Sequence, residues 1–173
     1  MRCHGSRIDG RYSMNNHLDM DFGHDLIDNG TSDDYYTPPF IFEALGVEFD
    51  LDVCSPSGGV PWIPAKKSLN VIDDGLSQDW HGLIWCNPPY SNPTPWAKKL
   101  VQHDNAFALI QTSKSAWFNL LWNHASGCVM MPSNLKFVRS DGSSAPVFMP
   151  TMLFSFGAAN RSILENSGLG LVR

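Results

Sequence analysis

The chain has 173 residues, 43% of them hydrophobic and 12% aromatic, which is enough for one core and too little for two of ordinary size. The spacing of its six histidines and of its four cysteines, which include no CxxC pair, argues against a disulfide framework and against a metal site. No apolar run approaches the roughly 20 residues that span a bilayer, so we expect a soluble cytoplasmic protein with no membrane contact.

The formal charge of −5 does not exclude a nucleic-acid partner, because the charge is uneven. Residues 1–34 hold three arginines against seven aspartates, or −4, which leaves −1 for residues 35–173. In that second part the cations are grouped, as in Lys66 with Lys67 and Lys136 with Arg139. A local basic face fits this pattern about as well as ordinary solvated lysines do.

The first elements in chain order are a polar arm over residues 1–34 and then a helix and a strand. The arm is rich in Asp, Asn, Gly and Ser and has little apolar periodicity. A helix is predicted from Pro38-Pro39 to Gly46, because proline suits a first turn and glycine a helix end. Residues 47–53 alternate apolar and acidic residues as a strand does, and a turn-rich loop follows.

Residues 60–80 give no clear pattern beyond one short strand or helix before Asp73-Asp74-Gly75. Further on, strands are predicted at 83–86, 106–111 and 129–131, and helices at 96–102 and 115–125. Residues 135–138 and 151–156 are predicted to pair as a hairpin across a Ser-Asp-Gly-Ser-Ser loop. Short strands alternating with helices predict an α/β fold, a single domain over residues 35–173 with a mostly parallel sheet and a C-terminal antiparallel hairpin.

The sequence IWCNPPYSNP, residues 84–93, combines an apolar strand with a rigid corner. Each proline fixes its own φ, removes a backbone donor and keeps the preceding residue extended. The corner therefore holds the Asn87 side chain, the Pro88 carbonyl and the Tyr90 ring in fixed relation. Two fixed acceptors beside an aromatic ring suit the exocyclic amino group of a flat base, such as an adenine taken out of a duplex or from a single strand.

Asp52 and Asn87 both lie where a predicted strand stops. In an open α/β sheet, ligands bind outside the carboxyl ends of the strands. We therefore expect the two side chains to lie in one site.

These residues resemble a known family. Asn87-Pro88-Pro89-Tyr90 is similar to the catalytic motif of methyltransferases that act on amino groups with S-adenosylmethionine. The wider pattern resembles the phage-type DNA N6-adenine methyltransferase (Dam-like) family, and it covers nearly all of the chain from residue 35 onward: Tyr36-Thr37-Pro38, Leu51-Asp52-Val53, Asp74-Gly75-Leu76, Trp80, Trp85 to Tyr90, Trp96 and Phe154-Ser155-Phe156.

The resemblance implies a Rossmann-like fold and a role for each matched residue. Asn87 and the Pro88 carbonyl would accept hydrogen bonds from the adenine N6 amino group, with Pro89 completing the corner and Tyr90 stacking on the base. S-adenosylmethionine would be the cofactor, with Thr37 and Pro38 at its methionine end, Asp52 at its amino group or ribose, Asp73 or Asp74 at its adenosine side, and Cys54 and Asn87 beside it. No metal is implied. A phage or prophage origin, a bacterial host cell and protection of DNA from restriction follow from the resemblance alone.

The sequence departs from the methyltransferase pattern at one place. Val-Cys-Ser-Pro follows Asp52, and the glycines of the expected glycine-rich loop come only at Gly58 and Gly59. Related enzymes that methylate RNA or protein glutamine usually keep that loop, so DNA is the favoured substrate. Those substrates, and a non-catalytic DNA-binding decoy, are the alternatives.

The chain has no room for a separate target-recognition domain, since its longest unassigned segments are about twenty residues. Recognition then depends on loops at 113–117 and 133–146, on the arm, or on a second subunit in a homodimer. Lys114, Lys136 and Arg139 are the cations expected to contact phosphates. A short or relaxed target sequence is the consequence.

Overall fold

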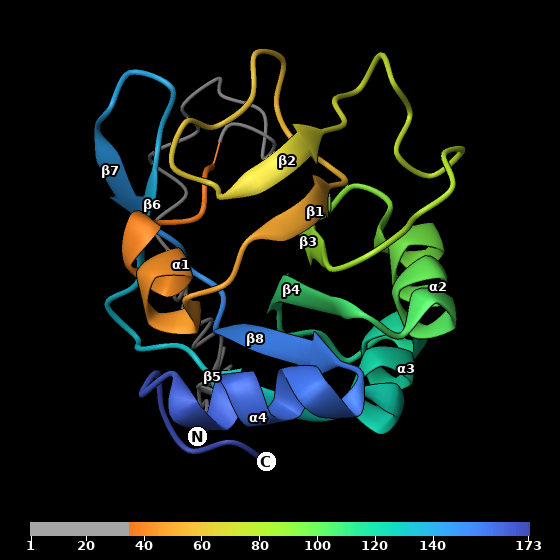
Figure 1. Cartoon of the computed structure of the whole chain (residues 1–173). Coiled ribbons are helices and arrows are strands. Elements are labelled where there is room, and N and C mark those ends of the chain that lie inside the picture. Colours follow the sequence, from red (N-terminus) through yellow and green to blue (C-terminus); the bar gives the residue numbers. More distant parts are fainter. Residues whose placement is uncertain (1–34) are drawn as a thin grey trace, which may run out of the picture.

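The computed structural model describes residues 35–173, so the predicted arm lies outside the described residues. Its main sheet has six strands in the order β2-β1-β3-β4-β8-β5 (Figure 1). The strands are β1 (Phe49–Asp52), β2 (Ala65–Ser68), β3 (Ile84–Cys86), β4 (Ala106–Gln111), β5 (Gly127–Met130) and β8 (Thr151–Phe156). Four helices accompany the sheet: α1 (Pro39–Leu45), α2 (Pro93–His103), α3 (Ala116–His124) and α4 (Ala158–Asn166).

The main sheet is mostly parallel, as predicted. β1 pairs in parallel with β2 and with β3, and β3 pairs in parallel with β4. β8 is antiparallel to both of its neighbours, β4 and β5, so β5 runs in the direction of the other four strands. The carboxyl ends of β1, β3 and β4 therefore open at one edge of the sheet.

Both faces of the sheet are covered, and alternate residues of each strand pack on opposite sides. In β4, Ala106, Ala108 and Ile110 pack in one core cluster with α2 and α3, and Phe107 and Leu109 pack in a second cluster with α1 and α4. Figure 1 shows α2 and α3 together on one side of the sheet and α1 and α4 on the other. This double burial explains why β3, β4 and β5 are nearly continuous apolar runs.

The predicted helix that follows Pro38 is confirmed in its local detail. α1 has proline in its first turn and ends at Gly46, whose φ of 61° is left-handed and whose N–H donates to the Phe42 carbonyl. The helix predicted at 96–102 is present as α2, which begins three residues earlier, at Pro93, and is capped after His103 by Asp104, with a left-handed φ of 51°.

The predicted pairing of residues 135–138 with 151–156 is wrong. β6 (Lys136–Val138) pairs instead with β7 (Ser144–Pro146) in a separate two-stranded sheet. β8 is an interior antiparallel strand of the main sheet, between β4 and the edge strand β5, and all six of its residues are buried. The antiparallel hairpin itself exists, over different residues, since the polar loop at 140–143 connects β6 to β7.

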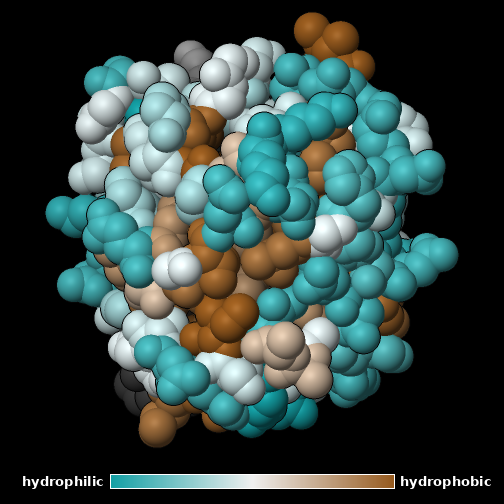
Figure 2. Space-filling view, in the orientation of Figure 1, coloured by the Kyte–Doolittle hydropathy of each residue, from teal (hydrophilic) through white to brown (hydrophobic). Residues whose placement is uncertain are grey.

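The surface of the molecule is mainly polar in the orientation of Figure 1, with apolar residues gathered in the middle of that face and single ones at its edge (Figure 2). Within residues 35–173, no helix combines the length and the apolar character that a membrane span needs.

Candidate active site

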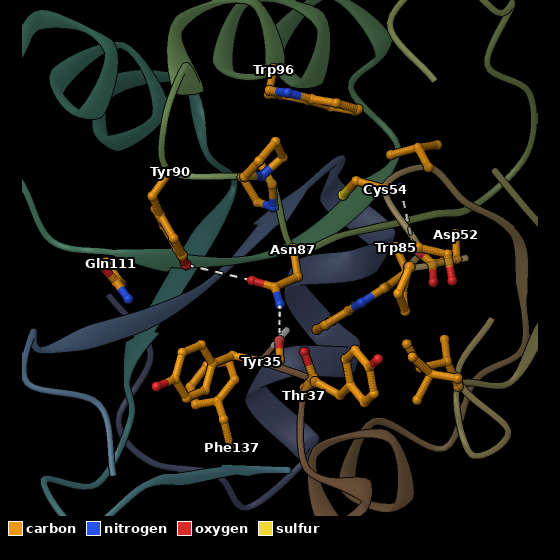
Figure 3. Close-up of a pocket in the computed structure, with 18 of the residues that line it drawn as sticks. Tyr35, Thr37, Asp52, Cys54, Trp85, Asn87, Tyr90, Trp96, Gln111 and Phe137 are labelled. Atoms are coloured by element: carbon orange, nitrogen blue, oxygen red, sulfur yellow. Dashed lines mark hydrogen bonds between the residues drawn. The ribbon is translucent and has the colours of Figure 1, made fainter. Parts of the chain in front are cut away.

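A cavity of about 940 Å³ opens where β1, β3 and β4 end. Asp52 closes β1, Asn87 follows β3 and Gln111 closes β4, and all three side chains line the cavity (Figure 3). Ligand pockets measure roughly 300–1,000 Å³, so this one has room for a cofactor together with a base. Asp52 and Asn87, both expected at strand ends, therefore line the same cavity.

The Asn87 amide is held in one orientation. Its Nδ2 donates to the Tyr35 carbonyl at 3.2 Å, and a carbonyl can only accept. Oδ1 must therefore point to the other side, where the Tyr90 hydroxyl lies 3.5 Å away (Figure 3). A contact of that length is weak, so Oδ1 keeps accepting capacity toward the cavity.

Tyr90 lies against the end of β4. Its hydroxyl donates to the Leu109 carbonyl at 3.3 Å, and burial raises the pKa of this phenol, which therefore stays neutral. Pro88 and Pro89 line the same wall of the cavity, and among the described residues no donor reaches the Pro88 carbonyl oxygen. The corner thus presents an amide oxygen and a carbonyl oxygen close together in sequence, both able to accept.

Asp52 is 2% exposed and has no cation beside it in the described residues. Burial raises its pKa from 3.8 to about 6, against two smaller opposing effects. One is the Cys54 backbone N–H, which donates to Oδ1 at 3.4 Å, and the other is the nearby Ser55 hydroxyl, which does not reach hydrogen-bond geometry. A buried carboxylate without a close partner is costly unless a ligand supplies the missing donor or charge.

Two further buried polar atoms of the described residues, both at the cavity, lack a hydrogen-bond partner. Within the described part of the chain, Thr37 Oγ1 and Ser55 Oγ are buried without a hydrogen-bond partner, and both residues line the cavity. Most buried polar atoms in native proteins are paired, so unpaired ones at a cavity indicate a polar ligand. The Trp62 indole N–H donates to the Thr37 carbonyl at 2.8 Å, which fixes the Thr37 backbone.

The wall beyond β1 consists of Asn70, Val71, Asp74 and Gly75, and at Gly75 it approaches the strand closely. A Cβ on Gly75 would lie 2.0 Å from the Val53 carbonyl oxygen, so only glycine fits there. Lys99 of α2 holds the following turn, because its Nζ donates to the carbonyls of Gly75, Leu76 and Gln78. Asp74 next to it lines the cavity with a left-handed φ of 49°.

The structure brings most of the predicted site residues together. The predicted residues that line the cavity are Thr37, Asp52, Cys54, Asp74, Asn87, Pro88, Pro89, Tyr90 and Arg139. Pro38 is buried behind this lining, and Lys114 and Lys136 are exposed outside it. The Cys54 thiol lies 3.6 Å from that of Cys86, and burial raises the pKa of the Cys54 thiol.

Sequence reasoning missed four of the polar lining residues: Tyr35, Tyr36, Ser55 and Gln111. Gln111 ends a predicted strand, so the rule that selected Asp52 and Asn87 would also have selected it. Tyr36 belongs to the Tyr36-Thr37-Pro38 segment that resembles the Dam-like pattern, which could have indicated it. Tyr35 and Ser55 carry no comparable signal, since tertiary contacts alone bring them to the cavity. No group of three His, Cys, Asp or Glu side chains suitable for a metal occurs within residues 35–173.

Comparison with known proteins gives a family for this site. The family model described as DNA N-6-adenine-methyltransferase (Dam) matches residues 26–157, which includes β1, β3 and the whole Asn-Pro-Pro-Tyr corner. The chain belongs to this family. The match begins within the segment predicted to be an arm.

One relative is the DNA N-6-adenine-methyltransferase of Haemophilus phage HP1 (strain HP1c1). It is 25% identical over 117 residues, which is 61% of this chain. The match spans 66% of that relative, slightly less than two thirds of its length. The Dam family and this relative therefore carry the same reaction in their names. The cavity described above is the place in this chain at which that reaction can be tested.

Proposed function

We propose that the protein transfers a methyl group from S-adenosylmethionine to the N6 amino group of adenine in DNA. The observation that carries the proposal is the pair of acceptors at the end of β3, Asn87 Oδ1 and the Pro88 carbonyl oxygen. The same cavity holds the buried Asp52, at the end of the neighbouring strand β1. Membership of the Dam family supports the same reaction.

The acceptors act on the amino group of the base. An adenine amino group carries two hydrogens, and Asn87 Oδ1 and the Pro88 carbonyl would each accept one of them. These bonds favour a pyramidal nitrogen with its lone pair directed away from the ring, which is the geometry that attack requires. Asn87 cannot rotate freely, because its Nδ2 is bonded to Tyr35. Positioning of this kind is a large part of catalysis when the donor is already activated.

The cofactor fits the polar groups that the chain leaves unpaired. S-adenosylmethionine supplies a methyl group on a positively charged sulfonium. Its methionine end carries an ammonium group, and its ribose carries two hydroxyls, so it offers the donors that Asp52, Thr37 Oγ1 and Ser55 Oγ lack. Asp74 and the glycine wall at Gly75 would lie toward the adenosine side.

The sheet order supports a Rossmann-like methyltransferase fold, since parallel strands with the site at their carboxyl ends are joined to one reversed strand near the far edge. The Haemophilus phage relative supports a phage or prophage origin, and with it a role inside a bacterial host in protecting DNA from restriction. Arg139 at the cavity, with the exposed Lys114 and Lys136, would contact DNA phosphates.

The test is transfer of tritiated methyl from S-adenosylmethionine to unmethylated DNA, followed by digestion of the DNA to nucleosides. The wild type is expected to give label in N6-methyladenosine, and Asn87→Ala is expected to give almost none. Binding of the cofactor by Asn87→Ala, measured by calorimetry, separates a catalytic defect from a folding defect.

Other outcomes decide between the alternatives. Label on RNA or on protein glutamine, with none on DNA, would replace the substrate while keeping the chemistry. Cofactor binding without label on any of these substrates would indicate a non-catalytic DNA-binding protein and would overturn the proposal.

A further inference from the structure

An exposed aromatic side chain stands at the mouth of the cavity. Phe148 is 91% exposed and the adjacent Met149 is 48% exposed, and both line the cavity that holds Asn87. A phenylalanine ring left in water forgoes the burial that stabilises most aromatic residues. Its position at the mouth of a site calls for an explanation that the methyl-transfer chemistry does not give.

The loop that carries Phe148 is anchored on both sides. Val147 before it packs against the second core cluster. After it, the Thr112 N–H donates to the Pro150 carbonyl at 2.8 Å, and Thr151 Oγ1 donates to the Met149 carbonyl at 3.1 Å. These contacts keep the loop in place, so the ring projects from a fixed base.

Positive charge lies next to this loop. β7 leads directly into it, and in the β6–β7 hairpin Lys136 is the register partner of Pro146, two residues before Phe148. Arg139, just after β6, lines the same cavity. An apolar tip beside cations matches a nucleic-acid duplex, which presents phosphates outside and stacked bases inside.

We propose that Phe148, flanked by Met149, inserts into the base stack of duplex DNA and occupies the space that the target adenine leaves. The inference rests on the proposed function and deepens it, because it makes an intact duplex the substrate. A base inside a duplex cannot reach Asn87 without leaving the stack, and leaving it costs unpairing and unstacking. Apolar side chains inserted between base steps offset part of that cost in other DNA-binding proteins.

The test compares two forms of one substrate. Unmethylated plasmid DNA is used intact as a duplex and heat-denatured as single strands, and tritiated methyl transfer is measured with wild type, Phe148→Ala and Phe148→Trp. Because the ring serves only to open the duplex, Phe148→Ala is expected to lower the duplex rate by roughly tenfold or more and the single-strand rate by no more than about twofold. Phe148→Trp keeps an apolar ring and is expected to retain most of the duplex activity.

Leu171→Ala is the matched control, because Leu171 is 97% exposed and does not line the cavity. It is expected to leave both rates unchanged. Fluorescence of 2-aminopurine in place of adenine in a duplex gives a second readout, since an extruded base brightens, and Phe148→Ala should weaken that increase.

The outcomes separate this inference from the proposed function. Three results would overturn the role of Phe148 and leave adenine methylation standing. Phe148→Ala could lose activity equally on duplex and denatured DNA, or it could lose activity on neither. The wild-type enzyme could also methylate denatured DNA and not duplex DNA. A wild type that methylates neither form of DNA would overturn both.

Discussion

Buried polar side chains occur at both ends of the main sheet, and the two ends treat them differently. At the amino ends of β3, β4 and β5 each is paired within the protein. Asn160 Nδ2 donates to the Phe156 carbonyl at 2.7 Å and to Asn105 Oδ1 at 2.9 Å, and Ser155 Oγ donates to the Gly127 carbonyl at 3.2 Å. At the carboxyl ends, Thr151 Oγ1 is paired with the Met149 carbonyl, outside the cavity lining. Within the cavity, Thr37 Oγ1 and Ser55 Oγ have no partner among the described residues, and Asp52 has only a long contact with the Cys54 N–H.

The contrast separates stability from function. A satisfied buried polar group fixes the structure and needs nothing further, whereas an unsatisfied one costs folding free energy until a ligand arrives. The carboxyl end of the sheet is therefore the part of this protein that is built for a ligand. Substitutions at the carboxyl end should therefore lower activity more than stability, and substitutions at the amino end should lower stability more than activity.

The two ends of the sheet are compared most directly by replacing one asparagine at each end with alanine, Asn87 at the carboxyl end and Asn160 at the amino end. Asn87→Ala removes an acceptor that acts on the reacting amino group, so kcat is expected to fall about 100-fold or more, as when one preorganised hydrogen bond is lost elsewhere. Its unfolding free energy should fall by no more than about 1 kcal/mol, because Tyr90 keeps the Leu109 carbonyl as a partner. The Tyr35 carbonyl loses its donor, but it belongs to a half-buried residue at the cavity, where water can replace that donor. Methyl transfer and urea unfolding measure the two effects. A loss of stability that accounts for the loss of activity would contradict the distinction.

Asp52→Asn removes the charge expected to hold the cofactor ammonium or ribose. Affinity for S-adenosylmethionine should fall roughly tenfold or more at pH 8, in the range of a lost charged hydrogen bond. Affinity of the wild type should also fall as the pH drops below about 6, where burial causes Asp52 to take up a proton. Calorimetry across pH 5–8 checks both, and a wild type and variant with parallel pH profiles would contradict the assignment.

The same carboxylate has a stability effect of opposite sign. Its pKa is raised on folding, so without ligand its penalty is absent below about pH 4 and fully present above about pH 6. Asp52→Asn should therefore stabilise the ligand-free protein at pH 8, by about 1–3 kcal/mol, and hardly at all at pH 4. Urea unfolding at the two pH values is the measurement.

Asn160→Ala is the counterpart of Asn87→Ala at the other end. It leaves the Phe156 carbonyl and Asn105 Oδ1 without their shared donor, so the unfolding free energy should drop by about 1–3 kcal/mol. Activity per folded molecule should stay within about twofold of wild type, because the residue is remote from the cavity. A selective fall in kcat with stability intact would break the comparison.

The smallest effect is expected at Lys99, which supports the cavity wall without lining it. Lys99→Met removes the donor for the carbonyls of residues 75, 76 and 78 and loosens the turn beside Asp74. Cofactor affinity is expected to weaken about three- to tenfold, with kcat nearly unchanged. Lys98→Met is the control, since Lys98 is the exposed neighbour on the same helix. Equal effects of the two variants would exclude a specific role for Lys99.

Much of the fold could be predicted because local patterns dominate it. Strands β3, β4 and β5 are short apolar runs, β1 alternates apolar and acidic residues, and α1 has proline and glycine at its two ends. β2 has three exposed residues and no apolar pattern, so its place at the edge of the sheet has no sequence signal. The partner of β8 was predicted wrongly, because proximity in sequence favoured residues 135–138 over β4, whose residue Ala106 pairs with Phe156. All six residues of β8 are buried, which is typical of a strand with a neighbour on each side and not of a surface hairpin.

The site was predictable where strand ends and motif coincide. Asp52 and Asn87 follow from the rule on carboxyl ends, and the proline corner follows from backbone chemistry. Thr37 and Cys54 came only from the resemblance to the Dam-like family. Tyr35 could not be foreseen, because its role depends on a backbone carbonyl that meets Asn87 across 52 residues of chain.

The reversed strand also sets the order in which the molecule can be completed during synthesis. Until residues 151–156 have emerged, β5 has no partner in the main sheet, and β4 has β3 alone. Before that point the nascent chain holds the strands β2-β1-β3-β4 and the separate strand β5, each with an unpaired edge. β8 then pairs with both edges. Pairing over such sequence separations is slow and leaves apolar edges exposed in the meantime. A chain interrupted before residue 151 would carry the complete Asn-Pro-Pro-Tyr corner and still lack the strand that joins the sheet.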